Sequence, residues 1–236
     1  DNLLTDIYLD TSRIEYQKER YVKALERFEE IYGEAGVEIY SAPGRSEVSG
    51  NHTDHQNGEV LAASINLDAI AVVKKNDVIR VVSDDYDMLT ISLDDIEKKE
   101  EEEGTTTSLI KGVLVGLKDR GNVIGGFDAY ITSDVLIGAG LSSSAAFETV
   151  IGTIVSGLYN EMKVSAVDTT TFCSNNNSKP KKTPIAERTP PANANFLKNL
   201  INNGIFCPSR CGEVFIIYSN LEAAFWNFAA HFTHSA

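Results

Sequence analysis

The sequence predicts a mixed α+β domain, because segments with helical and strand-like patterns are interleaved along the chain without a regular repeat. Residues 13–32 carry apolar side chains at three- to five-residue intervals among charged ones, which predicts an amphipathic helix that ends at Gly33. Residues 60–73 form an apolar run that favours a buried strand pair, and residues 127–133 resemble a further strand. An apolar helix is expected over residues 145–159.

Shorter elements are predicted between these segments. A strand is expected over residues 37–40, after which Pro43 and Gly44 should turn the chain. Residues 78–82 and 88–93 alternate in the manner of two strands.

A further helix is predicted over residues 108–119, with Ser108 as its N-cap. Its expected inward side chains are Leu109, Val113, Leu114 and Leu117. The charge run before it, residues 97–103, should be a solvated helix face or loop.

The composition of the chain changes after Asp168, where asparagines and prolines accumulate. We therefore expect one domain over residues 1–168 and a divergent tail over residues 169–236, partly disordered or irregular. Within the tail, residues 214–218 favour a strand and residues 221–232 an apolar helix.

The overall charge restricts the classes of partner. The chain has 34 acidic and 21 basic residues and a formal net charge of -13, which disfavours nucleic acid and, more weakly, anionic membranes. No segment approaches the roughly 20 apolar residues of a membrane span, and the first residues lack the pattern of a signal peptide. Three cysteines do not make a disulfide framework, so a cytoplasmic location is expected.

The strongest chemical signal is a glycine- and serine-rich turn between the predicted strand and the last long helix. Glycines permit positive φ, and a helix N-terminus offers unpaired N–H groups and partial positive charge to an anion. A serine hydroxyl can also ligate magnesium, although the pattern is not that of a Walker A loop. The alternative is a serine-capped helix that packs closely through small residues. The candidate anion-binding residues are Gly138, Ala139, Gly140, Leu141, Ser142, Ser143 and Ser144.

A second signal is a cluster of polar side chains before the apolar strand region. Arg45, Asn51, His52 and Asp54 lie within ten residues, and such groups can bind the hydroxyls of a sugar or the charge of a phosphoryl group. The alternative is a polar turn in which His52 caps a helix and Asp54 pairs with Arg45.

Together the two segments resemble the galactokinase branch of the GHMP small-molecule kinases. The family pattern Gly-Arg-x-Asn-Leu-Ile-Gly-Glu-His-Thr-Asp-Tyr-Asn is matched by residues 44–56, Gly-Arg-Ser-Glu-Val-Ser-Gly-Asn-His-Thr-Asp-His-Gln. Residues 138–145 match the family's Gly-x-Gly-Leu-Ser-Ser-Ser-Ala. The resemblance covers about residues 15–168. It implies the GHMP-kinase N-terminal domain, with the fold of ribosomal protein S5 domain 2: a mixed sheet with helices on one face.

The resemblance also implies a function, the ATP-dependent phosphorylation of galactose at its anomeric hydroxyl. Arg45 would orient the phosphoryl group and act in catalysis, while His52 and Asp54 would hold sugar hydroxyls. The loop over residues 138–144 would wrap the phosphates of ATP, and Ser144 would ligate Mg²⁺.

The sequence departs from the family in two places. Asn51 stands where the family has a sugar-contacting Glu, so the sugar need not be galactose. The family's later segment with the catalytic Asp is not legible after Asp168, and we expect the C-terminal kinase domain to be absent from this chain.

Three alternatives to a working kinase therefore stay open. The chain could be a non-catalytic sugar or ATP sensor, or a truncated inactive product whose exposed apolar surface favours self-association. A zinc site formed by Cys207, Cys211, His231 and His234 is the third.

Overall fold

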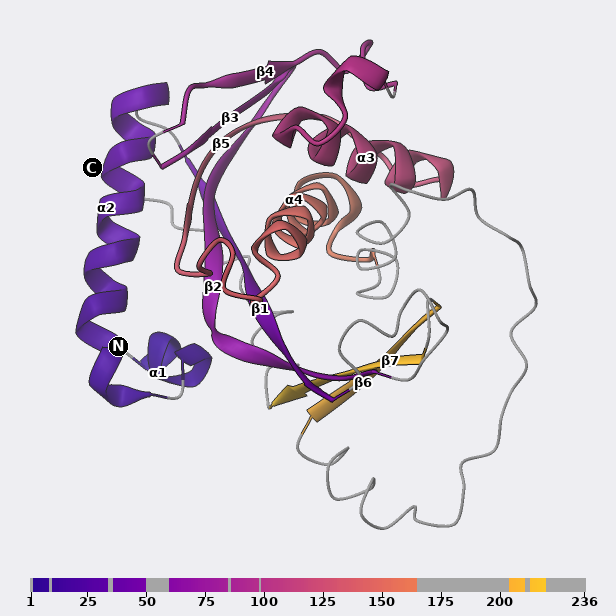
Figure 1. The fold of residues 1–236 in the computed structure, drawn as a ribbon. Coiled ribbons are helices and arrows are strands. Elements are labelled where there is room, and N and C mark those ends of the chain that lie inside the picture. Colours follow the sequence, from indigo (N-terminus) through magenta and orange to yellow (C-terminus); the bar gives the residue numbers. More distant parts are fainter. Residues whose placement is uncertain are drawn as a thin grey trace.

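A mixed β-sheet forms the centre of the molecule, with helices packed against it (Figure 1). The computed structural model describes residues 2–8, 10–33, 36–49, 60–84, 86–97, 99–164, 204–210 and 213–219. In these ranges the helices are α1 (Asn2–Tyr8), α2 (Ile14–Tyr32), α3 (Thr106–Asp119) and α4 (Ser143–Asn160), with short 3-10 helices η1 (Thr11–Arg13) and η3 (Glu100–Glu102). The strands are β1 (Glu38–Ser49), β2 (Val60–Asn76), β3 (Ile79–Ser83), β4 (Leu89–Ile91), β5 (Gly126–Ser133), β6 (Gly204–Arg210) and β7 (Glu213–Ser219).

The long strand β2 organises the sheet, whose order is β4-β3-β5-β2-β7-β6. Along one side, residues 69–76 of β2 pair antiparallel with β5, while residues 60–63 pair parallel with β7. On its other side β2 pairs antiparallel with β1. Parallel β3–β5 and antiparallel β3–β4 pairs complete the mixed sheet. The predicted mixed sheet with helices is confirmed.

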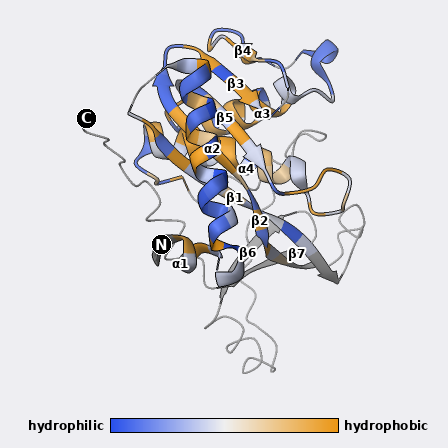
Figure 2. Cartoon of the chain, turned by 90° about the vertical axis from the view of Figure 1, so that its left-hand side faces the viewer, coloured by the Kyte–Doolittle hydropathy of each residue, from blue (hydrophilic) through white to orange (hydrophobic). Residues whose placement is uncertain are grey.

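Helices cover both faces of this sheet, so the prediction of helices on one face was wrong. One apolar cluster lies between the sheet and α3 and α4, and includes Leu114, Phe127 and Ile154. A second cluster, with Phe28 and Ile70, lies under α2 on the opposite face. Figure 2 views the molecule from the α2 side and shows this helix, in which many residues are hydrophilic, in front of largely hydrophobic strands. The amphipathic pattern of α2 showed that one side is buried, but it carried no information on which face of the sheet receives it.

Two predictions about the strands need correction. Pro43 and Gly44 do not turn the chain, because β1 continues through them with a register shift between Pro43 and Arg45. A proline is tolerated here because β1 pairs only with β2 in the described sheet, and an edge strand needs fewer N–H donors. The apolar residues 60–73 belong to one 17-residue strand rather than to a strand pair.

The start of α3 also differs from the prediction. Thr105, not Ser108, is the N-cap residue, and its hydroxyl accepts a hydrogen bond from the Ser108 backbone N–H at 3.3 Å. Thr105 has the extended backbone that a cap requires, whereas Ser108 already lies inside the helix. The charge run is not wholly solvated either, since Glu102 forms a 2.8 Å ion pair with the buried Lys111 of α3.

Part of the predicted tail joins the sheet. The strand expected over residues 214–218 is confirmed as β7, which pairs with both β2 and β6. The helix expected over residues 221–232 lies outside the described residues, and the domain boundary near Asp168 stays a prediction. No helix in the described ranges is both long and apolar enough to cross a membrane.

Candidate functional site

The glycine- and serine-rich segment forms the connection from β5 to α4. β5 ends at Ser133 and α4 begins at Ser143, so the helix starts among the serines as predicted. Gly138 and Gly140 have φ angles of 76° and 72°, and no atom lies within 4 Å of where a Cβ would be. Glycine is therefore needed at these positions for the left-handed backbone and not for space.

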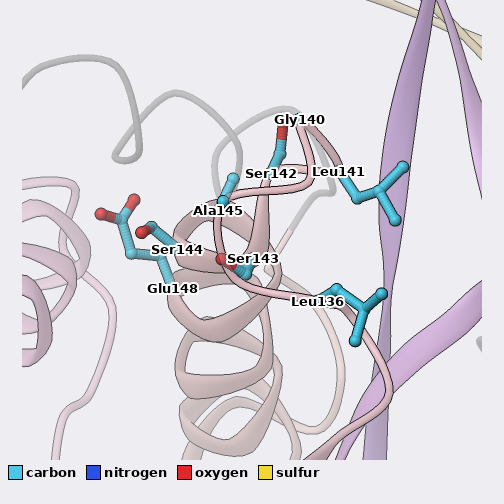
Figure 3. Close-up of a pocket in the computed structure, with 9 residues that line it drawn as sticks. Leu136, Gly140, Leu141, Ser142, Ser143, Ser144, Ala145 and Glu148 are labelled. Atoms are coloured by element: carbon cyan, nitrogen blue, oxygen red, sulfur yellow. The ribbon is translucent and has the colours of Figure 1, made fainter.

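An open pocket of about 360 Å³ lies at the N-terminus of α4 (Figure 3). Its polar character comes from the loop backbone and three consecutive serines, and the partial positive charge of the helix end favours an anion there. The lining residues are Leu136, Gly138, Gly140, Leu141, Ser142, Ser143, Ser144, Ala145 and Glu148. The structure thus brings the candidate anion-binding residues together, except Ala139, which does not line the pocket.

Arg45 of the second motif lies directly beside this loop. Its Nε donates a hydrogen bond to the Ser142 hydroxyl at 2.9 Å, and its backbone N–H donates to the Leu141 carbonyl at 3.1 Å. Gly44 makes the approach possible, because a Cβ at this position would lie 3.0 Å from the Leu141 carbonyl oxygen and 2.9 Å from a Val135 methyl. Two motifs far apart in the sequence are therefore joined in space, and a guanidinium is placed next to the pocket.

The other candidate sugar-binding residues, Asn51, His52 and Asp54, lie outside the described residues, and so do three of the four residues of the zinc alternative. Cys207 is in β6. In the described part of the chain there is no group of three or more side chains suited to hold a metal ion.

Glu148 is a residue of the pocket that the sequence interpretation missed. Its side chain is 4% exposed, and it lies four positions after Ser144 on α4. Residues with this spacing share one helix face, and Figure 3 shows both side chains on the same side of α4, away from Leu136 and Leu141. The i, i+4 spacing from the predicted magnesium ligand was the signal that could have identified it.

A hydroxyl and a carboxylate are donors of the kind that Mg²⁺ accepts. Ser144 and Glu148 therefore fit a magnesium ion that is shared with a phosphate ligand.

The start of the loop is fixed by α2 on the opposite face of the sheet. The Tyr16 hydroxyl donates to Asp134 at 2.7 Å, and the Asp134 backbone N–H donates to the Asp68 carbonyl at 2.9 Å. Arg20 lies 3.6 Å from Asp134 and forms a 2.6 Å ion pair with Asp68. The loop is thus held at both ends, by α2 at Asp134 and by β1 at Ser142.

Two known sequence signatures match the two motifs in the same order. Residues 26–75 match the galactokinase galactose-binding signature, which spans Arg45 and the polar cluster after it. Residues 108–177 match the N-terminal domain of the GHMP kinases, which spans the loop and α4. Over these two segments the chain matches the GHMP kinase family. The predicted resemblance is confirmed, and residues 26–75 indicate the galactokinase branch.

Several members of the family are similar to this chain over more than half of its length. The galactokinase of Enterococcus faecalis is 38% identical over 141 residues, which cover 57% of this chain and 36% of that protein. The galactokinase of Streptomyces coelicolor is 35% identical over 136 residues, covering 57% of this chain and 35% of that protein.

A solved structure, that of Lactococcus lactis galactokinase in complex with galactose, has a similar fold. It superposes with a TM-score of 0.58 and 29% sequence identity, over 64% of this chain and 40% of that chain. The present chain therefore spans little more than a third of the length of the relatives it matches.

Proposed function

We propose that this chain binds the triphosphate of ATP at the α4 pocket and serves in the phosphorylation of galactose, or a related sugar, at its anomeric hydroxyl. The observation that carries the proposal is the junction of the two motifs. Arg45 is bound to Ser142, the N-cap of the helix whose first residues border the pocket. The similarity to galactokinases supports the class of substrate.

In the proposed reaction, the bond between the γ-phosphorus and the bridging oxygen of ATP breaks, and a bond to the anomeric oxygen of the sugar forms. Backbone N–H groups and serine hydroxyls of the loop would hold the phosphates in line, and Arg45 would stabilise negative charge on the moving group. Positioning and charge stabilisation supply most of the catalysis in this class of reaction.

The sugar would be held by Asn51, His52 and Asp54, whose donors and acceptors suit hydroxyl groups. The proton of the anomeric hydroxyl must pass to a base, and the family resemblance implies that this base is the Asp of the family's later segment. Because this chain spans little more than a third of the length of its relatives, binding and turnover are tested separately, and a sensor that binds without turnover is the second candidate.

We further propose that Mg²⁺ enters the pocket with the nucleotide, held by Ser144 and Glu148. When bound, the ion would neutralise charge on the phosphates. The protein would act in a cytoplasmic compartment, where ATP and free sugar are both present.

Calorimetric titration with galactose and with a non-hydrolysable ATP analogue tests the function, together with an assay for galactose-dependent ADP release. Binding of both ligands with turnover supports the kinase, and binding without turnover supports the sensor. Failure of the folded chain to bind either ligand contradicts both.

The variants Gly140→Ala and Gly121→Ala form a matched pair for the nucleotide site. Both glycines have positive φ with open space around the missing Cβ, so both substitutions impose a similar strain of about 1–2 kcal/mol. Of these two glycines, only Gly140 lines the pocket. We expect Gly140→Ala to weaken binding of the ATP analogue about tenfold or more, since the loop amides shift, while Gly121→Ala leaves the affinity unchanged. Equal effects of the two variants would contradict a nucleotide site at this loop.

Glu148→Gln tests the proposed magnesium role of Glu148, because it should change the affinity for the ATP analogue in opposite directions with and without Mg²⁺. Without Mg²⁺ the variant should bind the ATP analogue more tightly than the wild type, because a repelling charge is removed. With Mg²⁺ it should bind more weakly and require a higher concentration of the ion. The exposed Glu161, changed to Gln, is the control, and a uniform loss of affinity with and without Mg²⁺ would contradict the metal role of Glu148.

A further inference from the structure

Ser142 has a backbone conformation that is unusual for the N-cap of a helix. Its φ and ψ angles are 58° and 49°, in the left-handed region, and its side chain makes no capping hydrogen bond to α4. A serine N-cap ordinarily has an extended backbone and accepts a hydrogen bond from the second or third helical N–H. The left-handed conformation costs a non-glycine residue about 1–2 kcal/mol. Glycine, which is frequent in this loop, would avoid this cost. We therefore expect the serine side chain to make an interaction that offsets the strain.

The conformation directs the Ser142 hydroxyl to Arg45. The Oγ accepts the hydrogen bond from Arg45 Nε at 2.9 Å, and the preceding residue, Leu141, accepts from the Arg45 backbone N–H. Two adjacent loop residues thus bind the backbone and the side chain of one arginine. This double contact fixes both where Arg45 leaves β1 and the plane of its guanidinium, because Nε is part of that rigid plane.

In the same conformation the Ser142 side chain makes no capping hydrogen bond to α4. The first N–H groups of the helix border the pocket, where an anionic ligand can take the place of the cap. The left-handed backbone of Ser142 therefore directs its hydroxyl to the guanidinium of Arg45 and not to the helix N–H groups.

We propose that Ser142 is a positioning residue that orients Arg45 toward the transferred phosphoryl group and couples the sugar motif to the phosphate loop. This inference rests on the proposed function and deepens it. Ser142 acts through Arg45 and need not touch the ligand, whereas Ser143 and Ser144 lie on the helix that receives the phosphates.

A double-mutant cycle of Ser142→Ala and Arg45→Lys tests the inference on the full chain, with binding of the magnesium complex of the ATP analogue as the readout. Arg45→Lys keeps the positive charge but removes the Nε donor. We expect each single variant to weaken binding about tenfold, as for the loss of one charge-assisted hydrogen bond. The double variant should be no weaker than Arg45→Lys alone, because both substitutions remove the same contact.

Two further variants separate orientation from backbone strain. Ser142→Gly relieves the left-handed strain but lacks the hydroxyl, so it should bind the analogue as weakly as Ser142→Ala. Ser142→Asn tolerates the left-handed region and offers a carbonyl oxygen, so it should recover part of the affinity. Recovery by glycine instead would show that Ser142 matters only for loop geometry, and would overturn the proposal.

Additive losses in the cycle would also overturn it, because Ser142 would then contact the ligand itself. Ser144→Ala is the comparison, since its loss should add to that of Arg45→Lys. If the wild-type chain binds neither nucleotide nor sugar, the proposed function fails. If it binds them and the cycle is additive, only the role of Ser142 fails.

Discussion

The two faces of the sheet are held to their helices by different kinds of interaction. Under α4 the contact is apolar, and Ile151, Ile154 and Val155 are fully buried there. Under α2 a buried ion pair between Arg20 and Asp68 lies within the apolar cluster. The difference is that a buried ion pair joins α2 to the sheet, whereas α4 packs on the sheet mainly through apolar side chains.

The polar contacts on the α2 face form a network centred on Asp68. Its carboxylate accepts hydrogen bonds from Arg20 at 2.6 Å, from Tyr8 at 2.9 Å and from Ser41 at 2.5 Å. Arg20 also donates to the backbone carbonyls of Asp68 and Thr132. Burial alone would lower the pKa of Arg20, but the adjacent Asp68 charge outweighs it and the pKa is raised, so the guanidinium stays charged. We call these residues the Asp68 network.

Among the substitutions that test this comparison of the two faces, Arg20→Met should have the largest effect on stability. It removes the buried cation and keeps most of the side-chain volume. Asp68 is 4% exposed and would be left as a buried charge without its ion-pair partner. The free energy of unfolding should fall by about 3–5 kcal/mol, as for other broken buried ion pairs. Urea denaturation measures the change, and Arg27→Met, at an exposed arginine of the same helix, should leave stability unchanged. A loss for Arg20→Met no larger than that of the control would show that the network is dispensable.

A smaller loss is expected on the apolar face from Gly157→Ala in α4. An added Cβ would lie 2.3 Å from the hydroxyl oxygen of the buried Tyr40, so the helix or the ring must shift. Overpacking of this kind costs about 1–3 kcal/mol. The control is Gly36→Ala, where nothing lies within 4 Å.

The Gly157 prediction can be checked by making room for the new methyl group. The double variant Gly157→Ala with Tyr40→Leu should be destabilised less than the sum of the two single variants, because each change relieves the defect of the other. Full additivity in urea denaturation would mean that Tyr40 does not limit the position of α4.

The smallest expected effect is a pH dependence of the free energy of unfolding. It comes from Tyr8, a residue of the Asp68 network on the α2 face. Burial, together with the Asp68 charge, raises the pKa of Tyr8 above its ordinary value of 10.0. Below pH 10 the phenol is neutral in both states and its contribution is fully present. Above pH 10 only the unfolded chain loses this proton, so stability should fall by about 1.4 kcal/mol per pH unit from this residue.

Tyr8→Phe should therefore cost about 1 kcal/mol at pH 8, for the lost hydrogen bond, and should reduce the alkaline loss between pH 10 and pH 11. Tyr86→Phe, at an exposed position, provides the comparison. The same alkaline slope in Tyr8→Phe and in the wild type would mean that the Asp68 network does not control this pH dependence.

Features that depend only on residues close together in the sequence were predicted correctly. The helical period of residues 13–32 and the stop at Gly33 correspond to α2, whose C-cap glycine has a φ of 82°. The glycines at 138 and 140 have the predicted positive φ, because that preference belongs to the residue itself. The prediction for residues 60–73 was wrong because apolar composition does not show where one strand ends and another begins.

The residues of the site were found only in part, for a related reason. Ser142 was identified as a ligand for phosphate, but its contact with Arg45 joins residues 97 positions apart. Glu148 was missed because its i, i+4 spacing from Ser144 identifies a shared helix face but does not show that this face borders a pocket.

The sequence by itself determined the loop, the helix that follows it and the family to which both motifs belong, since these follow from local backbone preferences and short motifs. Only the tertiary structure decided that α2 and α4 lie on opposite faces of the sheet, that β1 passes through Pro43 beside the loop, and that a buried glutamate borders the pocket. The physical reason is that such contacts depend on the packing of distant segments. Close approach at Gly44 and a shared hydrogen bond at Ser142 form only when the whole sheet is assembled.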